Sequence, residues 1–200
     1  MKMKNGWMFD EDEETGGKLF YWFRAATLQY VMKNWFLFLL AGLLPLLAAT
    51  PSAGPPTVIY LVRHAEKSAT PNDPALAPEG EARAQVLRQK LAGKHPAALF
   101  TTDTRRTRAT LAPLAQATGL TPQVYSPTEP DAFAIRLYQE YAGRTVVVVG
   151  HSNTLLPLLA ALGVKAPMTE IPETQYDNLF RVTLRPGEPA QLKVSHYGAR

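Results

Sequence analysis

From residue 57 onward, short apolar runs rich in β-branched and aromatic residues alternate with longer segments whose apolar positions recur at helical spacing. Runs of the first kind predict strands, and segments of the second kind predict helices. Strands are expected over residues 57–63, 97–101, 122–125 and 145–150, and helices over residues 78–93, 104–119, 130–141 and 153–162. This alternation is typical of a mainly parallel sheet covered by helices. The pattern therefore predicts an α/β fold, a single domain with three α/β/α layers.

Local signals refine this prediction. Residues 145–150 include four consecutive valines, which indicates a central strand buried on both faces. Either Asp103 or Thr104 can cap the helix that follows the second strand. Residues 178–184 and 191–197 alternate between apolar and polar positions, so we expect them to form a hairpin at the end of the sheet.

An uncharged apolar stretch over residues 35–49 precedes this domain, and a small, Pro-rich segment over residues 50–56 follows the stretch. It is shorter than the about 20 residues of a membrane span and fits the apolar core of a secretory signal peptide. We therefore interpret residues 32–54 as a signal peptide or an uncleaved N-terminal anchor. The protein is expected to be exported, to the periplasm, with membrane contact only through residues 32–54.

The first 31 residues do not fit the start of a signal peptide, because residues 10–14 are all acidic where positive charge is needed. Met32-Lys33-Asn34 does provide a short positive start. Our hypothesis is that translation begins at Met32, and that residues 1–31 are a start-site artefact or a disordered extension. Residues 55–200 remain as the folded domain.

Composition excludes several function classes. The net charge of +4 comes from dispersed basic residues without aromatic interleaving, which does not indicate a nucleic-acid partner. The chain has no cysteine, so disulfides, thiolate metal sites and a cysteine nucleophile are excluded.

Candidate chemistry lies at the ends of three predicted strands. Arg63 and His64 end the first, Arg105 and Arg106 follow the second, and His151 follows the valine-rich strand. In open α/β folds, ligands bind at the carboxyl ends of the strands. Arginine suits phosphate oxygens, and a neutral imidazole can attack phosphorus. The three strand ends therefore predict a phosphate pocket that contains a nucleophile.

Taken together, these motifs resemble the histidine phosphatase superfamily, whose fold is shared by phosphoglycerate mutases and many small phosphatases. Its Arg-His-Gly/Ala signature stands here as Arg63-His64-Ala65, its Arg-Thr-x-x-Thr motif as residues 106–110, and its late Gly-His as Gly150-His151. The resemblance covers about residues 57–197 and suggests a small exported branch with a phosphoglycerate mutase-like fold. It implies a phosphatase that forms a phosphohistidine on His64, without a metal or other cofactor.

The resemblance also implies that Arg63, Arg106 and His151 hold the phosphoryl group of a phosphorylated small molecule or a phosphoprotein. The register of Thr107 favours Arg106 over Arg105. Asn153 is expected to cap a helix, with contact to ligand as the alternative.

The acid that protonates the leaving group is less defined, because the family's motif is absent from residues 125–131. Glu129 is our first candidate and Asp131 the second, although Asp131 equally suits a helix start. We expect Glu66, His95 and His196 to have local structural or surface roles.

Two other functions fit parts of the sequence. Residues 150–154, Gly-His-Ser-Asn-Thr, are similar to a nucleophile elbow, in which Ser152 would serve a serine hydrolase. Thr154 stands where that tight turn needs a small residue. The other alternative is a non-catalytic envelope protein that only binds phosphorylated ligands.

Overall fold

The computed structural model describes residues 54–199, in which a six-stranded sheet has the order β3-β2-β4-β1-β5-β6. The strands are β1 (Thr57–Arg63), β2 (Ala98–Thr101), β3 (Gln123–Val124), β4 (Thr145–Gly150), β5 (Asn178–Leu184) and β6 (Gln191–His196). The neighbours from β3 to β1 pair in parallel, whereas β5 is antiparallel to β1 and β6 to β5. The predicted mainly parallel sheet with a terminal hairpin is confirmed.

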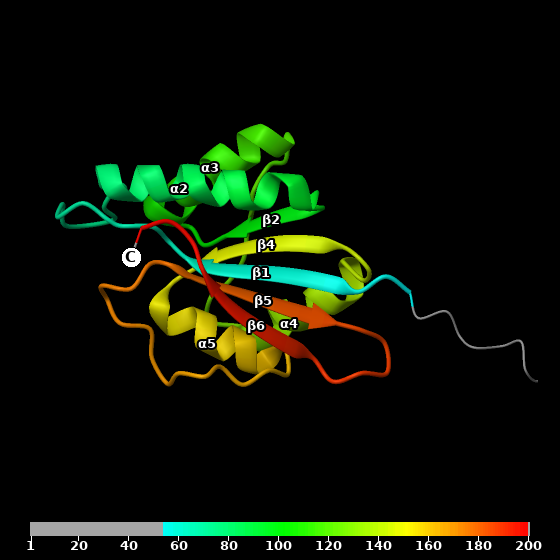
Figure 1. Cartoon of the computed structure of the whole chain (residues 1–200). Helices are drawn as coiled ribbons and strands as arrows, with labels where there is room; N and C mark the ends of the chain where they lie inside the picture. Colours follow the sequence, from blue (N-terminus) through cyan, green and yellow to red (C-terminus); the bar gives the residue numbers. More distant parts are fainter. Residues whose placement is uncertain (1–53, 200) are drawn as a thin grey trace, which may run out of the picture. The chain divides into compact units, whose positions relative to one another are not determined.

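Helices cover both faces of this sheet. They are α2 (Pro78–Leu91), α3 (Arg105–Thr118), α4 (Pro130–Glu140) and α5 (Ser152–Ala161), with a short 3-10 helix, η2 (Ala92–Lys94), after α2. The helices α2 and α3 lie on one face of the sheet, and α4 and α5 lie on the other (Figure 1). The three-layer α/β/α prediction is therefore confirmed.

The sheet has a hydrophobic core on each face, and successive side chains of β4 point alternately into one core and the other. Val146 and Val148 pack into the core under α4 and α5, whereas Val147 and Val149 pack into the core under α2 and α3. All four side chains are fully buried. Burial of a valine or similar side chain contributes about 1.5–3 kcal/mol, so β4 anchors both layers of helices.

The N-termini of α3 and α5 show which residues cap these two helices. Thr104 caps α3 through its hydroxyl, which accepts from the Thr107 N–H, while Asp103 pairs with Arg108 at 2.7 Å. The prediction that Asn153 caps the next helix is wrong, because α5 begins one residue earlier and His151 is its N-cap. The Thr154 hydroxyl accepts from the His151 N–H at 3.0 Å, which satisfies this helix end without Asn153.

Within residues 54–199, no helix is long and apolar enough to cross a membrane. The apolar stretch over residues 35–49 and the proposed start at Met32 lie outside the described residues.

The register between β1 and β4 prepares the site. Arg63 pairs with Gly150, and the His64 N–H donates to the Gly150 carbonyl at 2.9 Å. On the other side of β4, Thr101 at the end of β2 pairs with Val149. The carboxyl ends of β1, β4 and β2 therefore lie side by side, and the residues that follow them share one edge of the sheet.

Candidate active site

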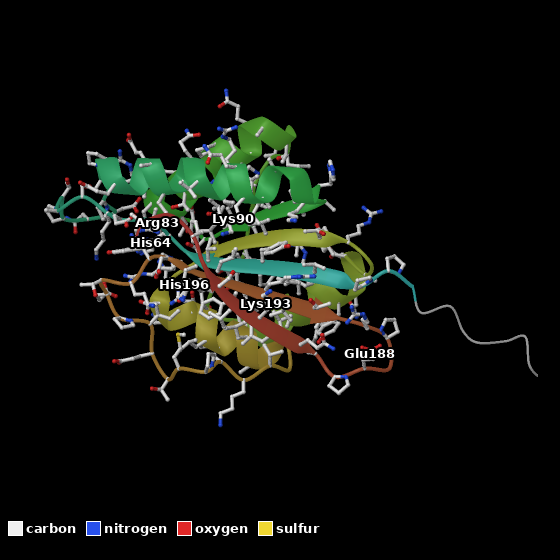
Figure 2. The ribbon with its side chains drawn as sticks, viewed as in Figure 1. His64, Arg83, Lys90, Glu188, Lys193 and His196 are labelled. Carbon is white, nitrogen blue, oxygen red and sulfur yellow. The ribbon has the colours of Figure 1, made fainter. Side chains whose placement is uncertain are left out.

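At this edge of the sheet lies a cavity of about 690 Å³, lined in part by Arg63, His64, Arg106 and His151. The structure thus brings together the four residues that were predicted from the sequence to lie at three separate strand ends. His64 lies just past the end of β1, far from Glu188 in the β5–β6 turn (Figure 2).

The protonation of His64 is fixed by the backbone. Its Nδ1 lies 2.8 Å from the Ala65 carbonyl oxygen, which can only accept a hydrogen bond. Nδ1 therefore carries the hydrogen, and Nε2 keeps its lone pair. Burial is the main cause that lowers the pKa of His64 to about 4, with Arg63 and Arg106 adding to it and the bond to Ala65 opposing it. The imidazole is neutral near pH 7.

His151 is held in the opposite tautomer. Its Nδ1 lies 3.4 Å from Nη2 of Arg106, and a guanidinium can only donate. Nε2 therefore carries the hydrogen and donates to the Thr102 hydroxyl at 2.8 Å. Burial, followed by the charges of Arg106 and Arg63, lowers the pKa of His151 to about 4. The centroids of the His64 and His151 rings lie 5.4 Å apart. Because the pKa of each is lowered to about 4, both rings in this pocket are neutral near pH 7.

Arg63 is a buried cation, with 2% of its side chain exposed. Its Nη1 donates to the Pro172 carbonyl at 2.8 Å, and its guanidinium carbon lies 4.4 Å from the centroid of the Tyr176 ring. Its Nη2 pairs with Glu173 at 3.0 Å. Among the described residues, no acceptor reaches its buried Nε. Backbone and aromatic contacts therefore fix the charge in place at the pocket.

The neighbouring arginines of α3 take different places. Arg106 lines the pocket beside His151, with 21% of its side chain exposed and Asp73 at 3.6 Å. Arg105 is exposed, and its backbone N–H donates to Asp73. The structure thus brings Arg106, and not Arg105, to the pocket.

The threonines of the 106–110 motif connect this helix to the other strand ends. Thr107 is buried and its hydroxyl donates to the Thr102 carbonyl at 3.0 Å. The Thr110 hydroxyl accepts from the Ala65 N–H at 3.0 Å. The loop after His64 and the segment that holds His151 are thereby attached to one helix.

The first turn of α5 also lines the pocket, through Ser152, Asn153 and Thr154. The N-terminus of a helix presents backbone N–H groups and partial positive charge, which favours an anion. Gly150 leaves no room for a side chain, because a Cβ there would lie 2.7 Å from the Tyr125 hydroxyl. Glycine at this position therefore lets the side chains of Tyr125, Leu155 and Thr154 pack closely against the end of β4.

The two carboxylate candidates are not brought into this lining. Glu129 and Asp131 are exposed at the start of α4, although Pro127 and Thr128 just before them do line the pocket.

The sequence missed Lys67 and Glu173, which both line the pocket, and Tyr176, which stacks on Arg63. The proximity of Lys67 to the Arg-His motif was an available signal. Glu173 and Tyr176 lie in an irregular loop without any motif.

The remaining candidates have structural partners. Glu66 accepts from Nε and Nη2 of the buried Arg83, which also donates to the carbonyls of Tyr197 and Ala199. His196 pairs with Asp177 at 3.0 Å, and His95 is exposed in a left-handed turn.

The geometry does not support a nucleophile elbow. Ser152 is a helical residue, and its hydroxyl donates to Glu173 rather than to an imidazole. Ser152 is not among the described non-glycine residues that have a positive φ angle. The strained backbone turn of a nucleophile elbow is therefore absent from this position. Within residues 54–199, no three His, Asp or Glu side chains are grouped so that they could hold a metal ion.

Comparison with known proteins gives one family-model match and several structural neighbours. The family model described as the histidine phosphatase superfamily (branch 1) matches residues 59–127. No curated protein matches the chain by sequence.

Among solved structures, a mycobacterial hydrolase superposes with a TM-score of 0.58 and 17% identity, covering 72% of this chain and 100% of its own. A mycobacterial glucosyl-3-phosphoglycerate phosphatase gives 0.57 and 15%, with the same coverage. The protein histidine phosphatase SixA, complexed with tungstate, gives 0.57 and 17%, covering 70% of this chain and 96% of its own.

Proposed function

We propose that this chain, which matches the histidine phosphatase superfamily model over residues 59–127, hydrolyses phosphomonoesters, or phosphohistidine on proteins, through a phosphohistidine intermediate on His64. The observation that carries the proposal is the tautomer of His64. Its Nδ1–H is donated to Ala65, so Nε2 keeps a lone pair in a pocket that also holds two guanidinium groups. A neutral imidazole beside fixed cations suits attack on a phosphoryl group.

In the first step Nε2 of His64 attacks phosphorus, an N–P bond forms, and the bond from phosphorus to the leaving group breaks. Arg63 and Arg106 neutralise the equatorial oxygens, and His151 donates a hydrogen bond to them from Nε2 once it turns from Thr102. Asn153, at the rim of the pocket, is proposed to contact the same group. In the second step water attacks the phosphohistidine, phosphate is released, and His64 returns to its neutral form.

The leaving group must gain a proton in the first step. Glu129 remains the proposed donor and Asp131 the second choice, because Thr128, the residue before Glu129, lines the pocket. A good leaving group, such as the imidazole of phosphohistidine or p-nitrophenolate, needs little help from such an acid.

The central test is rapid quench with a phosphomonoester. We expect an acid-labile, base-stable phosphoenzyme in the wild type, and neither phosphoenzyme nor turnover in His64→Ala. Full turnover by His64→Ala would remove the proposal. Phosphate binding without any turnover in the wild type would instead indicate the non-catalytic alternative. Activity is also expected to survive EDTA, because the proposed mechanism neutralises charge with side chains.

We also propose that the enzyme acts after export, in the periplasm, on a phosphorylated small molecule or phosphoprotein. The apolar stretch over residues 35–49 supports this. Intact-mass analysis of the protein from separated cell fractions tests it. A cytoplasmic protein that begins at Met1 would contradict both the export and the start at Met32.

A further inference from the structure

A carboxylate stands inside the cationic pocket. Among the described residues that line it, Glu173 is the one acidic side chain. Its Oε2 lies 3.0 Å from Nη2 of Arg63 and 3.8 Å from Nζ of Lys67, and its Oε1 accepts from the Ser152 hydroxyl at 3.2 Å. The carboxylate of Glu173 thus takes up the Nη2 donor of Arg63, which the proposed reaction needs for the phosphoryl oxygens.

Of the two partners, Glu173 is the one that can move. Arg63 is held by the Pro172 and Gln175 carbonyls and by the Tyr176 ring, and its side chain is 2% exposed. The side chain of Glu173 is 69% exposed. A phosphoryl oxygen that approaches Arg63 will therefore displace Glu173 and leave the arginine where it is.

The displaced carboxylate cannot go far, because its backbone stays on the loop that holds Arg63. Glu173 also lines two further cavities beside the phosphate pocket. One of them is also lined by three other acids, Glu66, Glu79 and Asp177, and by Arg83. A leaving group that extends from the phosphate pocket into either of these cavities passes Glu173.

The environment of Glu173 favours its ionised form. The positive charge of Arg63 is the main cause that holds the pKa of Glu173 below its usual value, with smaller help from Lys67 and Ser152. Above its lowered pKa it is a carboxylate, so any second anion on the substrate meets a like charge.

We propose that Glu173 is a specificity-determining residue, which holds Arg63 until a phosphoryl group replaces it and disfavours substrates whose leaving group carries a second negative charge. The preferred substrates are then phosphoesters or phosphoramidates with neutral or cationic leaving groups. This rests on the proposed phosphatase function of the same pocket.

A matched pair of substrates tests the selection. Glycerol 3-phosphate and 3-phosphoglycerate differ in the leaving group, which is neutral glycerol in the first and anionic glycerate in the second. The wild type should have the higher kcat/KM for glycerol 3-phosphate. Glu173→Gln should raise kcat/KM for 3-phosphoglycerate roughly tenfold more than for glycerol 3-phosphate, the scale of one unit charge acting across a few ångströms of partly solvated space. Glu188→Gln, an exposed residue of the β5–β6 turn that lines none of these three cavities, is the control and should leave the ratio unchanged.

Binding of inorganic phosphate, measured by calorimetry on the full chain, gives a readout that needs no turnover. Glu173→Gln should bind phosphate several-fold more tightly than the wild type, and Glu188→Gln should not. An unchanged phosphate affinity, or an equal change of kcat/KM for both substrates in an active enzyme, would overturn the inference and leave the proposed function intact. If the wild type turns over neither substrate nor p-nitrophenyl phosphate, the proposed function itself fails, and with it the selection.

Discussion

Arg106 and Arg105 are adjacent in sequence and differ in structure, which makes them a matched pair for testing how the pocket binds phosphate. We expect Arg106→Lys to lower kcat/KM strongly and Arg105→Lys to stay within about twofold of the wild type, as surface substitutions usually do. Lysine keeps the positive charge in both variants. The difference therefore measures the geometry of the guanidinium and not its charge.

The magnitude follows from two contacts. A lysine at position 106 cannot offer the planar pair of parallel N–H groups that a guanidinium offers to phosphoryl oxygens, and it also loses the contact from Nη2 to Nδ1 of His151 at 3.4 Å. Hydrogen bonds to charged groups contribute about 1.5–3 kcal/mol each, and with 21% of the side chain exposed, solvent compensates little. The sum of about 3–6 kcal/mol corresponds to roughly 10²–10⁴-fold in kcat/KM.

Steady-state kinetics with p-nitrophenyl phosphate measure this difference, and urea denaturation shows whether both variants are folded. The reasoning fails if Arg106→Lys retains activity within threefold of the wild type. A larger loss in Arg105→Lys than in Arg106→Lys would mean that the first turn of α3 has a different register from the one described.

Three further predictions concern pH, the acid and stability. Because the pKa of His64 is lowered from 6.5 to about 4, its neutral form persists on acidification, so the acid limb of kcat/KM should fall nearer pH 4; a midpoint at 6.5 would contradict the burial argument. Glu129→Gln should slow alkyl phosphates by roughly 10²-fold or more and p-nitrophenyl phosphate little; equally small effects of Glu129→Gln and Asp131→Asn on both substrates would exclude both as the acid. Arg83→Leu should lower the free energy of unfolding in urea by about 3–5 kcal/mol, because it leaves a partly buried carboxylate unpaired, whereas a loss as large in the surface control Arg88→Leu would refute that explanation.

The parts of the site that sequence could predict are those that strong local patterns carry. Arg63, His64 and His151 follow runs of β-branched residues, so their strand ends were visible, and parallel pairing brings such ends to one edge. Arg106 could be chosen over Arg105 because Thr107 fixed the register of the motif.

The parts that could not be predicted depend on contacts between distant segments. The bond from Arg63 to Pro172 joins residues 109 positions apart, and nothing in the irregular loop after α5 indicates which strand end it covers. Glu173 was missed for the same reason. The error at Asn153 was local, because the helix starts one residue earlier than the polarity of Ser152 and Asn153 suggests.

The pairing of Arg63 with Gly150 limits how this protein can vary in length. A strand rises about 3.3 Å per residue and alternates its faces, so one residue inserted in β1 or β4 would move His64 along the sheet and reverse the side on which the next residues lie. The His64 and His151 rings, whose centroids lie 5.4 Å apart, would then no longer face each other across the pocket. Insertions and deletions among natural variants should therefore be confined to the connections, and chain length from residue 57 to residue 64, and from residue 145 to residue 151, should be invariant wherever the chemistry is kept.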